Sequence, residues 1–292
     1  MNALLLMKTI TPLHVGIGRS AGYIDLEIAR EKTTGWPVVP GAGVKGALQA
    51  AFVADKDDAW EDDTCDPKRV SEAQTLFGKT SENPNAGQLC FSDFRTLLFP
   101  VPSICGGFAY ATSPLALRRF AEAVEVARGQ FDGFGDLTDD LEEIGTAKVV
   151  SNSPLMHANK VYLEDLDLNA TPVEDPTTLW EYVPESILSS NSRRQLAVVS
   201  DTIFRFLCEN CTEVTTRVSL EYGSKTAKKG QLRTEEAVPP EAVFYGLVHA
   251  QRIRNQLPEV AIASLEAILD NAHFQFGGKS TTGHGLCKVV KL

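Results

Sequence analysis

The chain carries Thr11-Pro-Leu-His14-Val-Gly16-Ile-Gly18 near its start and Phe276-Gly277-Gly278-Lys279-Ser-Thr-Thr-Gly283-His284-Gly285 near its end. Glycine lacks a Cβ atom and tolerates positive φ, so each segment lets a ligand approach the backbone closely. Apolar residues precede the first segment at 3–10 and follow the second at 285–292, and both runs are typical of strands. If these strands share one sheet, the two segments form a single anion-binding face.

A second glycine-bearing stretch follows a short Pro37-Val-Val-Pro40 segment. Residues 23–30 also have the pattern of a strand, so His14–Ser20 is expected to form a loop between two strands. Apolar residues then recur at helical spacing from Val44 onward, which places Lys45 near the start of a helix. A helix N-terminus carries unpaired N–H groups and a positive partial charge, so this position suits a phosphate.

The remaining pattern predicts an α+β fold, because strands and helices alternate loosely between long insertions. Ser113-Pro114 and Ser200-Asp201 have the residues of helix N-caps. Residues 214–221 and 231–238 alternate as the two strands of a hairpin with a basic turn. We expect one elaborated domain over residues 1–292, with a mobile insertion at 55–87 and an irregular insertion at 129–192.

Composition limits the class of protein. The 292 residues carry a net charge of −10, which argues against a nucleic-acid binder when the chain is taken as a whole. The window 217–233 is an exception, since Glu221 is its only acid among five basic residues. That window is either a solvated hairpin or a local RNA groove. No apolar run reaches membrane-spanning length, and no signal peptide is recognisable at the start. The six cysteines are therefore expected to be reduced thiols in a cytoplasmic protein.

Two short motifs suggest other chemistry. Gly41-Ala-Gly43-Val-Lys-Gly46 matches the GxGxxG pattern of dinucleotide-binding proteins, but Pro40 and the following acidic stretch depart from the usual strand–helix–strand setting. Cys208-Glu-Asn-Cys211 has the spacing of a zinc half-site. A structural zinc site needs four ligands, and the alternative is two small residues near the end of a core helix.

The chain resembles the RAMP superfamily of CRISPR effector proteins over nearly its whole length, and within it the backbone subunits of type III-B (Cmr) complexes. The resemblance rests on the order and spacing of several modest motifs. These are Thr11–Gly18, Asp25, Thr34–Gly41, Val44–Leu48, Leu98–Ser103, Ala111–Leu115, Val199–Asp201, Leu232–Glu236, Pro239, Phe244 and Gly277–Gly285.

The resemblance implies a ferredoxin-like, RRM-related core, elaborated by insertions that include a thumb. It implies copies stacked along a CRISPR guide RNA, together with other subunits of the effector complex. Each thumb then displaces one nucleotide, and complementary target RNA is cut beside each displaced position. A non-catalytic RNA-binding filament subunit of the same complex is the alternative.

The resemblance also assigns roles to individual residues. Asp25 matches an aspartate required for cutting, His14 matches a histidine of the same loop region, and Glu235 matches an acidic position near the cut, so all three are expected to be catalytic. For His14 the alternative is a histidine that contacts RNA or is structural. Ala237 stands where the family often has a tyrosine. A divalent cation such as Mg²⁺, bound through Asp25, would stabilise the phosphate charge; alternatively Asp25 acts as the base. The residues expected to contact RNA are Lys45, Gly277, Gly278, Lys279 and Arg217.

Overall fold

The first and last strands of the chain lie side by side in one large sheet. β1 (Asn2–Thr9) runs antiparallel to β17 (Leu286–Lys291), with Leu6 opposite Val290. On its other side β1 pairs antiparallel with β15 (Val243–Ala250). The condition that the sequence analysis set for a single face, that these two strands share one sheet, is therefore met.

The structure is a computed structural model that describes residues 1–19, 22–54, 67–79, 84–139, 141, 145–253, 256–270 and 273–292. Its large sheet has 13 strands in the order β16-β17-β1-β15-β6-β7-β12-β8-β11-β10-β9, with β4 paired to β6 and β5 paired to β15. The other strands of this sheet are β4 (Val38–Val39), β5 (Leu89–Phe91), β6 (Phe94–Ser103), β7 (Gly107–Thr112), β8 (Thr146–Val150), β9 (Met156–His157), β10 (Lys160–Leu163), β11 (Leu166–Val173), β12 (Leu196–Val199) and β16 (His273–Gln275). The helices are α1 (Gly41–Val53), α2 (Pro67–Phe77), α3 (Pro114–Arg128), α4 (Thr177–Tyr182), α5 (Ser190–Arg193), α6 (Asp201–Asn210) and α7 (Pro258–Leu269), with 3₁₀ turns η1 (Gly135–Thr138) and η2 (Ser280–Thr282).

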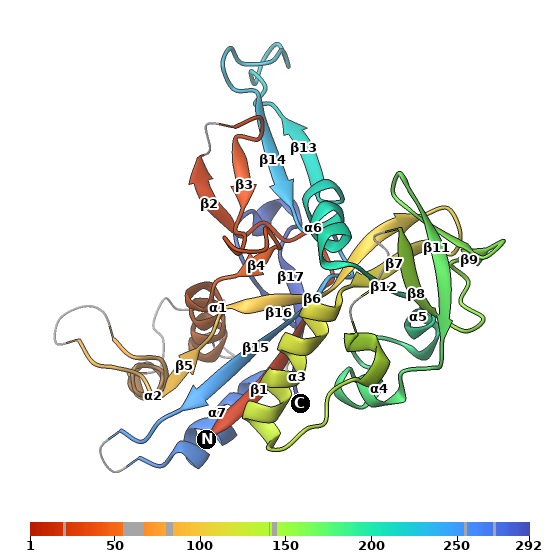
Figure 1. Cartoon of the computed structure of the whole chain (residues 1–292). Coiled ribbons are helices and arrows are strands. Elements are labelled where there is room, and N and C mark those ends of the chain that lie inside the picture. Colours follow the sequence, from red (N-terminus) through yellow and green to blue (C-terminus); the bar gives the residue numbers. More distant parts are fainter. Residues whose placement is uncertain are drawn as a thin grey trace.

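Helices cover both faces of the sheet, and alternation along β1 shows why. Leu5 and Met7 point into a core that also contains side chains of α1 and α7. Leu4 and Leu6 point to the opposite face, into a second core with α3. Successive strand residues face opposite sides, so a strand that is apolar at every position must be buried on both. Figure 1 shows α3 lying across β1 on one of these faces.

The helix starts that the sequence predicted are confirmed by their caps. The Ser113 hydroxyl accepts a hydrogen bond from Ala116 N at 3.3 Å, with Pro114 in the first turn of α3. Ser200 accepts in the same way from Ile203 N at the start of α6. Both serines satisfy an N–H group that the helix itself cannot pair.

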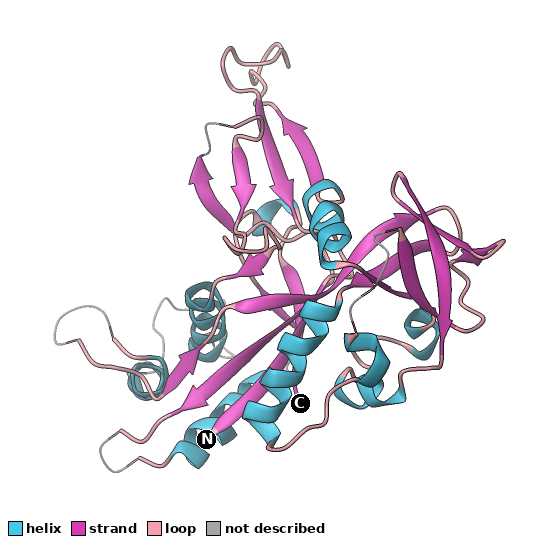
Figure 2. Ribbon diagram, in the orientation of Figure 1, coloured by secondary structure: helices cyan, strands magenta, loops and turns pink. Residues whose placement is uncertain are grey.

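A separate 4-stranded sheet, in the order β13-β14-β3-β2, projects from the large sheet (Figures 1 and 2). It contains β2 (Gly16–Arg19), β3 (Leu26–Ile28), β13 (Glu213–Arg217) and β14 (Arg233–Ala237). The hairpin is shorter than predicted, because β13 ends at Arg217 and β14 begins at Arg233. The exposed residues between them turn, with an isolated bridge from Leu220 to Ala227 and positive φ at Lys225. Part of the loop expected at 14–20 is a strand, because β2 pairs with β3.

The two expected insertions differ in how much of them is described. Of residues 55–87, the stretches 55–66 and 80–83 lie outside the described residues, while α2 occupies 67–77. The segment 129–192 is not irregular, since it contains β8 to β11 and two short helices. β8 pairs with β12 and β11, which lie far along the chain, and such pairing leaves little trace in local periodicity. Among the described residues, no helix is both long and apolar enough to cross a lipid bilayer. The fold is mixed α and β.

Candidate functional site

The two glycine-bearing segments that open and close the chain lie against each other. Gly278 N donates to His14 O at 3.0 Å, and Gly285 N donates to Pro12 O at 2.8 Å. Gly277 has a φ of +68°, and a Cβ atom there would lie 2.3 Å from His14 O. Only glycine fits this position, so the close contact between the segments depends on it.

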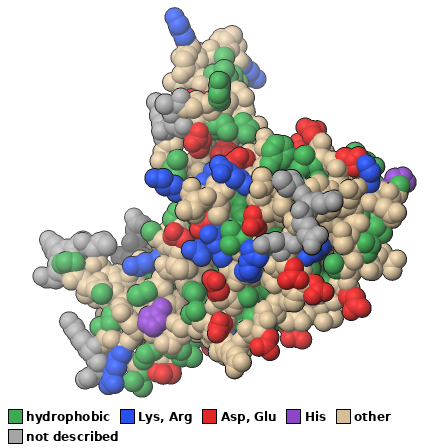
Figure 3. Space-filling view, viewed as in Figure 1, with side chains coloured by type: hydrophobic (Ala, Val, Ile, Leu, Met, Phe, Trp, Pro, Cys, Tyr) green, Lys and Arg blue, Asp and Glu red, His purple; other side chains and the backbone are tan. Residues whose placement is uncertain are grey.

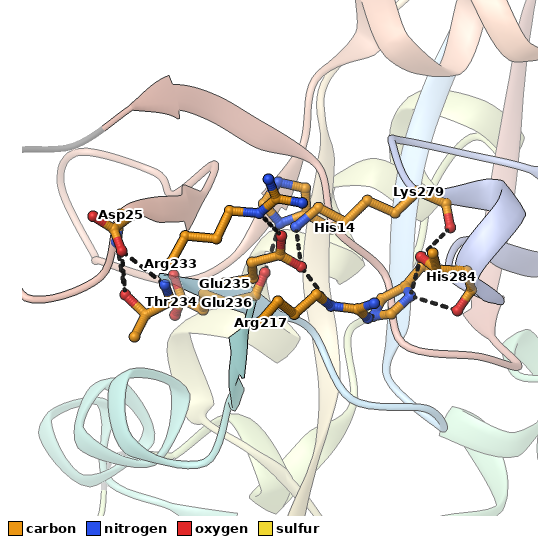
Figure 4. A network of polar contacts seen from close by, with 10 residues as sticks. His14, Asp25, Arg217, Arg233, Thr234, Glu235, Glu236, Lys279 and His284 are labelled. Carbon is orange, nitrogen blue, oxygen red and sulfur yellow. Dashed lines mark hydrogen bonds and ion pairs between the residues drawn. The ribbon is translucent and has the colours of Figure 1, made fainter. Parts of the chain in front are cut away.

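A buried carboxylate gathers three cations beside these loops (Figure 4). Glu235, which is 3% exposed, lies 2.6 Å from Lys279 Nζ and 2.7 Å from Arg233 Nε. Glu235 Oε2, the oxygen that contacts Lys279, also lies 2.8 Å from Arg217 Nε. Arg217 and Arg233 are opposite one another across β13 and β14, so their side chains reach the same carboxylate. We call Glu235, Arg217, Arg233 and Lys279 the Glu235 cluster.

The charges of the Glu235 cluster decide the state of the acid. Burial alone would raise the pKa of Glu235, but hydrogen bonds from Lys279 and Arg233 and the charge of Arg217 outweigh it and lower the pKa. The carboxylate is therefore ionised at neutral pH. Three cations around one anion leave a positive surface on a chain of net charge −10. Such a surface suits an anionic ligand such as a nucleic-acid backbone.

Asp25 lies on an exposed loop, directly before β3. The pairing of Leu26 with Glu235 brings β3 alongside β14. Asp25 Oδ2 accepts from Thr234 N at 2.7 Å and from Thr234 Oγ1 at 3.0 Å. In return, Asp25 N donates to Thr234 Oγ1 at 2.9 Å. Thr234 thus fixes the orientation of a carboxylate that solvent and ligands can reach.

His14 is buried between the terminal loops and β14. It is 7% exposed, and its Nδ1 lies 2.6 Å from the carbonyl oxygen of Glu236. A carbonyl only accepts, so Nδ1 carries a proton and holds the ring in place. A Cβ atom at Gly16 would lie 2.6 Å from His14 Nε2, so a glycine is needed next to this nitrogen. The burial of His14 and its hydrogen bond to Glu236 suit a histidine that holds the terminal loop against β14 better than one that contacts a ligand directly.

Lys45 is not part of the Glu235 cluster. It lies in α1, half-buried, beside a groove between α1 and α2. The GxGxxG glycines all lie within this helix instead of in a loop after a strand, and Gly41 N donates to Asp93 Oδ1 at 2.8 Å. The dinucleotide interpretation of these residues is therefore wrong, because no turn is present to hold a pyrophosphate.

Comparison with known proteins shows the family. A model described as the RAMP superfamily matches residues 6–288. The chain belongs to the RAMP superfamily. It is 29% identical over 294 residues to the Pyrococcus furiosus protein named CRISPR system Cmr endoribonuclease Cmr4, covering 97% of this chain and 93% of that protein. It is 22% identical over 318 residues to the Saccharolobus solfataricus CRISPR system CMR subunit Cmr4, covering 97% and 94%.

Solved RAMP structures share the fold. The crystal structure of oligomeric Cmr4 from Pyrococcus furiosus superimposes with a TM-score of 0.70 at 27% identity, covering 100% of this chain and 98% of that one. A chain in the cryo-EM structure of type III-B Cmr-beta bound to cognate target RNA gives a TM-score of 0.75 at 20% identity, covering 100% and 97%. At this lower identity the likeness concerns the fold alone.

Three residues of this candidate site were not named as site members in the sequence analysis. Arg233 completes the Glu235 cluster, Thr234 holds Asp25, and His284 lies with Nε2 3.5 Å from Arg217 Nη2. The available signal was the alternation of β14, which places residues 233 and 235 on one face and residues 234 and 236 on the other. Ala237 is buried and brings no aromatic group.

The possible metal ligands among the described residues are scattered. Across the described ranges, no group of three or more His, Cys, Asp or Glu side chains is arranged to hold a metal ion. Asp25 is bonded to Thr234, and Glu235 is neutralised by basic groups. The CxxC pair shows the core-helix alternative, with Cys208 buried in α6 and Cys211 at its C-cap.

Proposed function

We propose that this chain is a backbone subunit of a CRISPR RNA-guided complex, which binds guide RNA along its backbone and cleaves complementary target RNA. One observation carries the proposal. Glu235 gathers three basic side chains, those of Arg217, Arg233 and Lys279. The preceding residue on the strand, Thr234, holds Asp25. Neighbouring residues of β14, Thr234 and Glu235, thus hold the candidate cleavage residue and organise the proposed RNA-binding surface. Family membership and the 29% identical relative named an endoribonuclease support the same reading.

We further propose a ferredoxin-like core. In chain order it consists of β1, α1, β6, β15, α7 and β17, and the strands lie in the order β17-β1-β15-β6 with every neighbouring pair antiparallel. This is the strand order of a βαββαβ unit, with α1 and α7 packed in the same core. The 13-stranded sheet extends beyond this unit, and the segments between its strands supply the elaborations.

The 4-stranded sheet and the segment 218–232 are the proposed thumb. This segment carries three lysines and exposed side chains that include Leu220 at 52%, Tyr222 at 102% and Leu232 at 68%. Figure 3 shows basic and hydrophobic side chains at the tip of the projecting part of the molecule. Apolar and aromatic groups on a basic hairpin suit contact with nucleic-acid bases and phosphates together. Figure 1 shows the hairpin projecting from the rest of the molecule. In this proposal it reaches between neighbouring nucleotides.

Guide binding requires only backbone contacts. The Glu235 cluster offers cations to phosphate. Gly277 packs against His14, and the neighbouring Gly278 leaves space for an RNA strand to approach the loop. Contacts of this kind carry no sequence information, which suits a protein whose guide sequence varies. The partners in this proposal are guide RNA, target RNA, further copies of the chain and other subunits of the complex. The relative described as oligomeric supports self-association, and a cytoplasmic location follows from the proposed partners.

RNA is cut in this proposal by attack of a 2′-hydroxyl on the adjacent phosphate. This forms a 2′,3′-cyclic phosphate while the bond from phosphorus to the 5′-oxygen breaks and that oxygen takes up a proton. The protein must hold the 2′-oxygen in line, move its proton and stabilise charge on the phosphate. Asp25, oriented by Thr234, is the candidate group at the 2′-hydroxyl. Glu235 is a positioning residue, because its charge is used in holding Arg217, Arg233 and Lys279. A divalent cation remains part of the proposal only if RNA supplies most of its ligands, and no step is routed through it.

The test is cleavage by the assembled complex. Wild-type and Asp25→Ala proteins are assembled with guide RNA, and end-labelled complementary RNA is added with and without Mg²⁺. Regularly spaced products that disappear in Asp25→Ala, with target binding unchanged, support the proposal. Cutting that persists in the variant removes Asp25 from the site. Intact target RNA in both samples favours the alternative, a backbone subunit that binds RNA without cutting it. That alternative is motivated by Ala237, which stands where the family often has a tyrosine.

A further inference from the structure

Two tyrosine rings on the projecting part of the molecule lie entirely in solvent. Tyr23 is 104% exposed and Tyr222 is 102% exposed, and among the described residues no other Phe, Trp or Tyr side chain is as exposed. Tyr222 belongs to the segment 218–232, which is already part of the proposed thumb. Tyr23 lies in the loop that leads from β2 to β3. Its ring is used neither by the fold nor by the proposed function.

The backbone of Tyr23 is anchored, although its ring is free. The Thr234 hydroxyl lies 3.2 Å from the carbonyl oxygen of Tyr23, which accepts a hydrogen bond from it. The same hydroxyl lies 3.0 Å from Asp25 Oδ2 and accepts from Asp25 N at 2.9 Å. One side chain of β14 therefore holds both residues (Figure 4 shows its bonds to Asp25). The Tyr23 ring projects from a fixed point two residues from the candidate cleavage group.

Packing does not account for an aromatic residue at this position. A fully exposed ring buries no apolar surface, so it contributes no hydrophobic stabilisation to the fold. A lone exposed aromatic side chain is common on protein surfaces and needs no explanation by itself. Tyr23 differs because its backbone shares the Thr234 hydroxyl with the Asp25 carboxylate. The ring is thus presented where a nucleotide bound at Asp25 would carry its base.

An unpaired RNA base is the ligand that such a ring fits. Proteins bind the unstacked bases of single-stranded RNA by stacking them on aromatic side chains. A base that is paired with the guide and stacked between its neighbours has no free face, so the ring selects a nucleotide that has left the duplex. Attack by a 2′-hydroxyl also needs a nucleotide that is turned until this oxygen lies in line with the phosphate. Stacking and cleavage therefore require the same displaced nucleotide.

We propose that Tyr23 stacks on the unpaired base of target RNA beside the cut and so holds the ribose of that nucleotide against Asp25. The inference rests on the proposed function and deepens it, because it names a residue that positions the substrate. Purines stack more strongly than pyrimidines, so Tyr23 also makes the cleavage rate depend on the identity of the unpaired base.

The test compares cut sites within one target RNA under single-turnover conditions. Complexes assembled with guide RNA receive end-labelled targets that carry adenine, uracil or an abasic ribose at the unpaired position beside one mapped cut. The other cuts in the same RNA are unchanged and serve as references. In wild type, the rate at the changed site should fall in the order adenine, uracil, abasic ribose, with about a tenfold loss for the abasic ribose.

Variants of Tyr23 separate stacking from other contacts. Tyr23→Ala should slow every cut about tenfold and remove the difference among the three targets. Tyr23→Phe keeps the ring and should behave like wild type, whereas Tyr23→Leu keeps an apolar side chain without a π face and should behave like Tyr23→Ala. Because the ring is fully exposed, each variant should melt within about 2 °C of wild type.

Ile104 provides a matched control. It is another exposed apolar side chain, at 78%, and lies in the turn between β6 and β7, within the large sheet instead of the projecting one. Ile104→Ala should leave the cleavage rate and the order of the three targets unchanged.

A second readout does not require cutting. In complexes that carry Asp25→Ala, a target with 2-aminopurine at the unpaired position reports stacking, because a stacked ring quenches its fluorescence. The fluorescence should rise when Tyr23→Ala is added to Asp25→Ala and should stay unchanged when Tyr23→Phe is added.

The outcomes separate this inference from the proposed function. If the wild-type complex cuts and Tyr23→Ala matches it in rate and fluorescence, the inference is overturned and the proposed function stands. A slower Tyr23→Ala that still distinguishes adenine from the abasic ribose also overturns it, because the base is then recognised elsewhere. If the wild-type complex leaves target RNA intact, the cleavage part of the proposed function fails. The fluorescence then decides the stacking contact: a rise in Tyr23→Ala supports it, and no rise overturns it.

Discussion

Lys279 Nζ lies 2.6 Å from a carboxylate oxygen of Glu235, and this ion pair joins the C-terminal glycine loop to β14. Lys279 itself has a φ of +69°, so the loop adopts a left-handed conformation at the residue whose side chain makes the contact. The pair fixes where the lysine is presented and leaves Arg217 and Arg233 beside it. Glu235 therefore organises a positive surface, instead of acting as a free acid or base.

Replacing Glu235 should lower the stability of the folded chain. Glu235→Gln removes the only anion among three cations, and we expect the free energy of unfolding to fall by about 1–3 kcal/mol. The range is below that of a fully buried pair because the Arg217 and Arg233 side chains are 33% and 50% exposed. Urea denaturation measures the change. Glu221→Gln removes an exposed acid of the hairpin and should change stability by less than about 0.5 kcal/mol; equal effects of the two variants would argue against the role given to Glu235.

The stabilisation by Glu235 should depend on pH in one direction. Burial opposes ionisation, yet Lys279, Arg233 and Arg217 hold the pKa of Glu235 below its ordinary value of 4.5. A lowered pKa in the folded state means that the stabilisation is fully present above about pH 4.5 and is lost as the pH falls through the folded-state pKa. The difference in unfolding free energy between wild type and Glu235→Gln should stay constant from pH 7 to about pH 5 and shrink below it. A difference that grows toward acid pH would contradict this assignment.

Thr234 should matter for cleavage through Asp25. Thr234→Val keeps the shape of the side chain but removes the hydroxyl that bonds Asp25 Oδ2 at 3.0 Å. We expect the cleavage rate of the assembled complex to fall by about tenfold, with KM for target RNA unchanged. Thr234→Ser retains the hydroxyl and should restore most of the rate. In an Asp25→Ala background Thr234→Val should have no further effect, and an additive loss would show that Thr234 acts by another route.

Local features of this fold could be predicted from the sequence because their causes are local. Ser113 and Ser200 cap helices through hydrogen bonds to residues three positions away. The apolar runs at 3–10 and 285–292 predicted the two terminal strands. The glycine segments beside them suggested one anion-binding face if these strands share a sheet. The GxGxxG interpretation failed for a related reason, since Gly41 to Gly46 continue a helix and the motif alone does not specify the turn it requires.

The site was harder to predict because its contacts join distant segments. Asp25 and Glu235 were assigned from the family resemblance, but nothing in the sequence indicates that Thr234 bonds Asp25 or that Arg217, Arg233 and Lys279 share one carboxylate. These contacts depend on the pairing of β3 with β14 and of β13 with β14, which tertiary structure alone establishes. Within 129–192, strands β8, β9 and β11 were missed for the same reason.

Gly277 and Gly283 provide a matched test of the contact between the two ends of the chain. Both have positive φ, +68° and +83°, so alanine is strained at either position by about 1–2 kcal/mol. At Gly283 a Cβ atom meets nothing within 4 Å, whereas at Gly277 it would lie 2.3 Å from His14 O. Gly277→Ala must therefore also displace the loop that carries Lys279 away from His14. We expect thermal unfolding to show a clearly larger loss of stability for Gly277→Ala than for Gly283→Ala, and guide-RNA binding to fall only in Gly277→Ala. Equal losses in both variants would mean that the close approach of the two terminal segments contributes little to the site.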